Sequence, residues 1–236
     1  MEQTAENTLN TPHHTPQELE EAYAVMARGG LILVKLDIGY GFVGCSEEAI
    51  RRMYELKGRP ASNPCVVPGN MAILQQLCPG IDARTLDWIG EQMRWTTLSV
   101  IGDLNEDSTL WQSLPPFVRN QSSHERSVAV FLRPGTFLEA LVERAFDDGR
   151  LLAGSSGNLS GQGNCYRPED LAESIIEGVD LFINHGVARY ENPQRMATTM
   201  IDLRTLEIKR RGINCAKLES SLARLRADSG NQRART

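Results

Sequence analysis

Apolar residues at helical spacing first occur between two clear boundary signals. Thr15-Pro16-Gln17-Glu18 has the form of a capping box with proline at the first helical position, and Gly29-Gly30 ends the pattern. These signals predict a helix that begins at residue 16. The apolar run that follows predicts a buried strand over residues 31–35, and the glycine-punctuated segment after it predicts a strand or turn over residues 40–44.

Short apolar runs and helical patterns alternate through the rest of the chain. Helices are predicted over residues 47–56 with Ser46 as cap, from Asp82 to residue 93, from a second capping box at Thr136-Phe137-Leu138-Glu139 to residue 146, and over residues 167–177. Strands are predicted over residues 65–67, 98–101, 128–132, 151–153, 180–183, 199–203 and 207–210. Strands interleaved with helices in this way predict an α/β fold with a mixed sheet.

Composition and the two chain ends favour one globular domain. The 236 residues have ordinary apolar and charged fractions, and both ends are polar and lack apolar periodicity. We therefore predict a disordered tail over residues 1–14, a single domain over residues 15–215, and a C-terminal helix followed by a tail, disordered from residue 227, within residues 216–236. The sequence shows neither a membrane-spanning apolar run nor a signal-peptide pattern, so we expect a cytoplasmic protein with no membrane partner.

The charge of the chain argues against broad binding to nucleic acid but leaves a local basic patch possible. The net charge of −5 argues against salt-driven binding to nucleic acid as the main task. Basic residues nevertheless concentrate in two clusters. The first holds Arg51, Arg52, Lys57 and Arg59, and the second holds Lys209, Arg210 and Arg211. If folding brings the two clusters together, they form a basic patch.

Lys57-Gly58-Arg59-Pro60 is the first candidate binding segment. Gly58 lets the chain turn at the end of the predicted helix, and Pro60 prevents the helix from continuing. Two cations on a short rigid loop suit a polyphosphate, because lysine supplies a point charge and arginine supplies a planar fork of donors. The alternative is a helix C-terminus that the cations stabilise, with no ligand.

A second candidate segment lies at the end of a predicted strand. Residues 151–161 form an apolar strand that leads into a loop of glycine, serine and asparagine, and strand ends of this kind hold ligands in α/β proteins. Ser156, Asn158 and Ser160 can hydrogen-bond to phosphate or ribose oxygens. The segment is neither a Walker loop nor a dinucleotide fingerprint, and the alternative is an ordinary turn. The histidines lack metal-ligand spacing, so no protein metal site is predicted.

Five landmarks occur in a characteristic order over residues 16–212. They are Gly29-Gly30, Asp37 with Tyr40-Gly41, Lys57-Gly58-Arg59-Pro60, Ser156-Gly157-Asn158-Leu159-Ser160-Gly161, and Thr198-Thr199-Met200-Ile201-Asp202 ahead of Arg210 and Gly212. In this order and spacing the chain resembles the YrdC-like family, whose best-known activity is threonylcarbamoyl-AMP synthesis. The resemblance implies a twisted mixed β-sheet flanked by helices, with a basic concave groove.

The resemblance also implies a reaction and a set of contacts. ATP, bicarbonate and L-threonine, or another small amine, combine to give a carbamoyl adenylate and pyrophosphate, an intermediate for tRNA modification or for a specialised biosynthetic pathway. Mg²⁺ is expected with the ATP phosphates, and Lys57 and Arg59 are expected to act in catalysis. Carried over position by position, the ATP contacts are Lys57, Arg59, Ser156, Asn158, Ser160 and Arg210, and the substrate contacts are Asp37, Tyr40, Thr97 and Thr199.

Three positions depart from the family pattern. The family signature Pro-Thr-Asp/Glu-Thr-x-Tyr-Gly-Leu is replaced here by a segment with Leu36 and Ile38 at the two threonine positions, and Phe131 stands where the family usually has arginine. Leu36 and Ile38 offer no hydroxyl to a polar substrate, so the acceptor can differ from threonine. The alternative function is a noncatalytic module that binds tRNA, double-stranded RNA or a nucleotide in the same groove.

Overall fold

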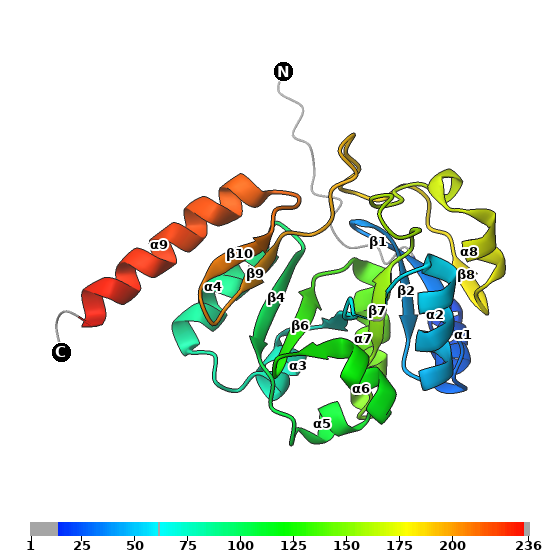
Figure 1. Ribbon diagram of the computed structural model, residues 1–236, viewed down its shortest axis with the longest axis horizontal. Helices are drawn as coiled ribbons and strands as arrows, with labels where there is room; N and C mark the ends of the chain where they lie inside the picture. The colour runs from blue at the N-terminus through cyan, green and yellow to red at the C-terminus, as the bar shows by residue number, and fades with distance from the viewer. Residues whose placement is uncertain (1–13, 61, 234–236) are drawn as a thin grey trace.

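The computed structural model describes residues 14–60 and 62–233, so residues 1–13 of the tail predicted over residues 1–14 lie outside these ranges. Two β-sheets are surrounded by helices (Figure 1). The smaller sheet has the strand order β7-β2-β1-β8, in which β1 pairs antiparallel with β2 and parallel with β8. Its strands are β1 (Ile32–Leu36), β2 (Gly39–Gly44), β7 (Ala153–Ser156) and β8 (Leu181–Ile183).

The larger sheet is also mixed and has the order β10-β9-β4-β6-β3, with β5 paired beside β6. β4 pairs antiparallel with β6 and parallel with β9. Its strands are β3 (Val67–Gly69), β4 (Leu98–Asp103), β5 (Ser123–His124), β6 (Ser127–Leu132), β9 (Met200–Asp202) and β10 (Glu207–Arg210). The predicted α/β class with mixed pairing is therefore confirmed, but the strands form two sheets instead of one.

A backbone junction joins the two sheets. Val66, just before β3, and Gly154, in β7, each donate a backbone N–H to the other's carbonyl oxygen at 2.9 Å. A Cβ atom on Gly154 would lie 2.1 Å from the carbonyl oxygen of Phe42, so only glycine fits this approach. Helix α7 (Thr136–Asp147) packs against both β1 and β3 and closes the core across the junction. The two sheets are thereby fixed relative to each other.

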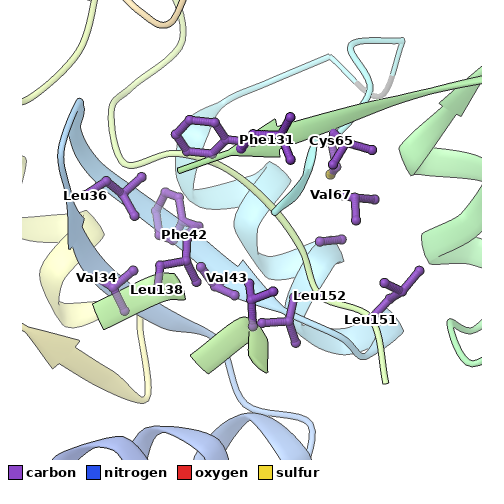
Figure 2. Packing of buried hydrophobic residues seen from close by; sticks show 14 of the residues in the cluster. Val34, Leu36, Phe42, Val43, Cys65, Val67, Phe131, Leu138, Leu151 and Leu152 are labelled. Carbon is purple, nitrogen blue, oxygen red and sulfur yellow. The ribbon is translucent and has the colours of Figure 1, made fainter. Parts of the chain in front are cut away.

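The core is continuous across the junction. Figure 2 shows buried side chains of both sheets and of α7 packed in one region, including Val34, Phe42, Val67, Phe131 and Leu138. Burial of apolar side chains from separate elements is the main stabilising term of such a domain.

Three predicted helix starts are confirmed in detail. The side chains of Thr15, Ser46 and Asp82 accept backbone N–H groups of the first turns of α1 (Pro16–Ala27), α2 (Glu47–Lys57) and α4 (Ala83–Met93). The remaining helices are α3 (Met71–Leu77), α5 (Thr109–Gln112), α6 (Pro116–Ser122), α8 (Glu173–Glu177) and α9 (Cys215–Arg233), with a 3₁₀ turn over Pro168–Asp170. None of the described helices is long and apolar enough to cross a membrane.

Two helix predictions were wrong in their details. Gly135, not Thr136, is the cap of α7, and the Glu139 carboxylate accepts its backbone N–H at 3.2 Å. The single helix predicted over residues 167–177 is split into the 3₁₀ turn and α8. The split occurs because the Asp170 carboxylate accepts the backbone N–H groups of Tyr166 and Arg167 and thereby fixes a separate turn.

Two strand predictions were displaced along the chain, and one tail prediction was wrong. The strands predicted at residues 65–67 and 151–153 form two residues later, because β3 pairs with β6 and the serines of β7 pair with β2. The other strands are confirmed with small boundary shifts. Helix α9 continues to Arg233, although we expected disorder from residue 227. Its buried Leu222 and Leu225 anchor the helix, from which further turns add at little cost.

We predict that Gly154→Ala destabilises the protein by on the order of 3 kcal/mol, because the methyl group overlaps the Phe42 carbonyl at the sheet junction. Urea unfolding followed by circular dichroism measures this change. Gly90→Ala is the matched control, since its methyl group would enter open space on α4 and should change stability by no more than about 1 kcal/mol. Equal stabilities for the two variants would contradict the assigned role of the junction.

Candidate functional site

A groove of about 570 Å³ lies between the two sheets. One side is formed by β1, β2 and β7, and the other by β4, β6, β9 and β10. Volumes of this size are typical of small-molecule sites. The charged side chains that line the groove are Arg59, Arg204, Lys209, Arg210, Glu125 and Asp202.

Arg59 is braced on both sides of the sheet junction. Its Nη1 donates to Ser155 Oγ in β7 at 2.6 Å, while Nε donates to the Asn63 carbonyl at 3.2 Å and Nη2 to the Pro64 carbonyl at 2.8 Å. All of these acceptors are uncharged. The guanidinium is therefore held in place without being neutralised.

Arg210 enters the same groove from β10 of the larger sheet. Its Nε donates to the Thr198 carbonyl at 3.0 Å. Arg210 is partly exposed, but protein surrounds much of its guanidinium, and this desolvation, followed by the like charge of Arg59, lowers the pKa of Arg210. Within residues 14–60 and 62–233, neither Arg59 nor Arg210 forms an ion pair with a carboxylate.

The other two cations of the groove are already paired. Arg204 contacts the buried Asp202 carboxylate at 2.7 Å, and Lys209 lies 3.8 Å from the same group. Hydrogen bonding from Arg204 lowers the pKa of Asp202 and keeps it ionised. The positive charge available to a ligand is thus concentrated on Arg59 and Arg210.

Lys57 is buried behind the groove and does not line it. Its Nζ donates to the carbonyl oxygens of Ser156 and Asn158, the second at 2.7 Å, and lies 3.4 Å from Ser156 Oγ. Its own carbonyl accepts the Ser160 backbone N–H at 2.9 Å. The structure therefore brings the two predicted segments together, but it uses Lys57 to fix the loop over residues 156–160 instead of presenting its amino group to the groove.

The three polar residues predicted in that loop differ in their placement. Ser156 lines the groove. Asn158 is buried, its Nδ2 donates to the Leu159 carbonyl at 2.7 Å, and its Oδ1 has no protein partner among the described residues. Ser160 is exposed and lies off the groove. Only Ser156 of the three reaches the groove surface.

The predicted substrate residues Asp37 and Tyr40 have protein partners. The Asp37 carboxylate lies 3.8 Å from Arg189 and outside the groove lining, and burial raises its pKa. Tyr40 borders the groove, but its hydroxyl donates toward oxygens of Asn184 and Gly186 at 2.8 Å, and burial raises its pKa to about 12. Tyr40 therefore ties the loop after β8 to the groove edge.

Thr97 and Thr199, the other two predicted substrate contacts, hydrogen-bond to the backbone. Thr97 Oγ1 donates to the Leu132 carbonyl at 3.0 Å, and Thr199 Oγ1 donates to the Ile213 carbonyl at 2.7 Å. Both side chains are buried and outside the groove lining. The hydroxyls satisfy backbone carbonyl groups, and their predicted contact with a substrate stays a prediction.

Sequence reasoning missed several polar residues that do line the groove. Successive side chains of a strand point to opposite faces of the sheet. A residue next to a predicted site residue can therefore be the one that lines the groove. Alternation around Leu98 and Val100 offered a signal for Ser99, but no pattern indicated Asn164 in its loop. The missed groove residues include Ser99, Ser155, Asn164 and Thr198.

A comparison of the whole chain with protein-family models identifies its relatives. The model for Sua5, YciO and YrdC sequences, described as "Telomere recombination", matches residues 24–212. The chain belongs to the Sua5/YciO/YrdC family. The predicted YrdC-like resemblance is therefore confirmed. No curated protein matches the chain in sequence.

Solved structures share the fold of this chain. A hypothetical protein, smu.1377c, from Streptococcus mutans has a TM-score of 0.76 at 16% identity, covering 92% of this chain and 94% of that one. E. coli YciO has a TM-score of 0.67 at 19% identity, covering 84% of this chain and 91% of the YciO chain. P. abyssi Sua5 in complex with L-threonine has a TM-score of 0.65 at 22% identity, covering 80% of this chain and 51% of the Sua5 chain. This family member thus spans about half the length of the Sua5 chain.

We predict that Lys57→Met lowers the free energy of unfolding by on the order of 1 to 3 kcal/mol, because it leaves the Ser156 and Asn158 carbonyls without a donor. Burial, followed by the charge of Arg59, lowers the pKa of Lys57 to about 7 from 10.5. At pH values between these two pKa values, Lys57 is protonated in the unfolded chain and deprotonated in the folded chain. Lys57 therefore makes the free energy of unfolding rise with pH.

The difference in unfolding free energy between wild type and Lys57→Met should therefore grow from pH 7 to pH 10, as measured by urea unfolding. Lys209→Met is the control, because Lys209 is exposed and holds only long ion pairs. A difference for Lys57→Met that stays flat or shrinks over this range would contradict the assignment.

Proposed function

We propose that the protein binds ATP in the groove and uses it to form a carbamoyl adenylate from bicarbonate and a small amine or amino acid. The observation that carries this proposal is the pair of guanidinium groups of Arg59, from the loop after α2, and Arg210, from β10, which line one groove without a carboxylate partner among the described residues. A polyphosphate supplies the counter-charge that this pair lacks. Ser155, which accepts a hydrogen bond from Arg59, and Ser156 add hydroxyl groups to the groove lining.

The proposed reaction balances with these reactants alone. The amine and bicarbonate condense to a carbamate with release of water. A carbamate oxygen then bonds to the α-phosphorus of ATP as the bond from that phosphorus to the bridging oxygen breaks, and pyrophosphate leaves with the electron pair. Negative charge builds on the phosphates during this step, and fixed guanidinium groups stabilise it without reorganisation. No protein nucleophile is needed.

Mg²⁺ enters this proposal as part of the substrate MgATP. Among the described residues, no group of three histidine, cysteine or acidic side chains is arranged to hold a metal ion. Asp202, a carboxylate of the groove, is already engaged by Arg204. We therefore expect phosphate oxygens and water to hold the ion, as is common for Mg²⁺.

Family membership supports the proposed chemistry. The chain matches the Sua5/YciO/YrdC model over residues 24–212, and a Sua5 of this fold was solved with L-threonine bound. By this likeness the amine substrate is an amino acid or a related amine. The product would then serve tRNA modification or a specialised biosynthetic route in the cytoplasm.

We predict that Arg59→Ala and Arg210→Ala each weaken ATP binding by about tenfold to a hundredfold, because each removes charge-assisted hydrogen bonds to phosphate. Calorimetric titration of ATP with Mg²⁺ measures the loss. Arg211→Ala is the matched control, since Arg211 follows Arg210 but pairs with Glu219 on α9 and lies outside the groove lining. Its affinity for ATP should equal that of the wild type.

Two other outcomes would redirect the assignment. If ATP does not bind and RNA binds in a salt-dependent manner, the groove serves the noncatalytic RNA-binding alternative. If ATP binds but no pyrophosphate is released with bicarbonate and any amine, the protein binds the nucleotide without this reaction.

A further inference from the structure

One part of the groove is walled by apolar side chains from separate elements. Leu36 ends β1, Ile38 lies in the turn that follows, Phe131 comes from β6 and Leu138 from α7. We call these four residues the apolar wall. Figure 2 shows Leu36, Phe131 and Leu138 close to Phe42 of β2 in the packed interior, and all of them line the same groove.

The backbone beside the apolar wall is already hydrogen-bonded within the protein. The Ile38 carbonyl accepts Asn164 Nδ2 at 2.7 Å, the Asp37 N–H donates to the Pro134 carbonyl at 2.7 Å, and the Asp37 carbonyl accepts the Tyr190 N–H at 2.9 Å. Each of these groups therefore already has a protein partner, and the Asp37 N–H has no further hydrogen to donate to a polar substrate.

The strand register places Phe131 of the apolar wall in line with Arg210. Phe131 is paired with Ser99, Ser99 with Met200, and Met200 with Arg210. Three strand spacings separate Phe131 from Arg210, about 14 Å. A small amine whose side chain contacts Phe131 can thus direct its nitrogen past Ser99 toward phosphates held at Arg210.

We infer that the amine substrate carries a branched aliphatic or aromatic side chain, which binds against the apolar wall. This inference rests on the proposed ATP-dependent reaction. A hydroxyl group buried against the wall loses its hydrogen bonds to water, whereas each buried methylene group favours binding by about fourfold. The acceptor is an apolar amine or amino acid, and threonine is a poor substrate.

Pyrophosphate release by the wild type tests the inference. With saturating ATP, Mg²⁺ and bicarbonate, L-leucine or 3-methylbutylamine should exceed L-threonine and ethanolamine in kcat/KM by tenfold or more. L-Leucine and 3-methylbutylamine differ only in the carboxylate. The ratio of their kcat/KM values therefore distinguishes an amino acid substrate from a simple amine. A preference for L-threonine would overturn the inference while leaving the proposed function intact.

Two double variants locate the preference on the wall. Leu36→Thr with Ile38→Thr should shift selectivity toward L-threonine by at least tenfold, whereas the matched Leu36→Val with Ile38→Val should keep the apolar preference. Thermal unfolding followed by circular dichroism checks that both variants fold. An unchanged ratio in a folded threonine variant would contradict the role of the wall.

Binding without ATP separates this inference from the proposed function. ¹H–¹⁵N NMR titrations of the wild type with 3-methylbutylamine and with ethanolamine should shift the amide signals of Leu36 and Ile38, at concentrations tenfold lower for the apolar amine. Equal responses would overturn the inference even in a protein that lacks ATP-dependent activity. If the apolar amine binds while ATP does not, the proposed function fails and the apolar site stands.

Discussion

The pair of backbone hydrogen bonds between Val66 and Gly154 is the constraint on which the groove depends. These bonds hold the two sheets edge to edge. Because Gly154 has no side chain, β7 can closely approach the backbone of Phe42. Arg59 bonds to Pro64 on one side of this junction and to Ser155 on the other. A change in the mutual placement of the sheets would therefore move the guanidinium as well as the groove walls.

The cations near the groove have different structural roles that follow from their partners. Arg204 is paired with Asp202, and Lys209 lies 3.8 Å from both Asp202 and Glu207, so these two cations fix β9 and β10 and offer little net charge to a ligand. Lys57 is surrounded by oxygen acceptors and orders the loop after β7. Arg59 and Arg210 bond to uncharged oxygens and repel each other, a cost that a bound polyanion offsets.

Local sequence signals predicted those features that depend on one turn of chain. The caps at Thr15, Ser46 and Asp82 are of this kind, since each bonds to a backbone N–H three residues away. Long-range contacts decided the rest. The buried position of Lys57 depends on a loop about a hundred residues later in the chain, which its local segment could not reveal.

The face of a strand was equally hidden in the sequence. In a run such as Thr198-Thr199-Met200 the side chains alternate with a period of two, but the phase is set by packing of the sheet. Thr198 and Met200 face the groove, while Thr199 bonds to the backbone of residues 212 and 213. The family resemblance identified the fold and the segments, and the structure decided which side chains within them are placed to bind a ligand.

A crystal structure of the protein with MgATP bound tests the central claim most directly. The account predicts the triphosphate between Arg59 and Arg210, with Ser155 and Ser156 beside it and Lys57 still bonded to the loop carbonyls. Phosphates bound elsewhere, or an ATP contact made by Lys57 after it leaves the Ser156 and Asn158 carbonyls, would contradict the account.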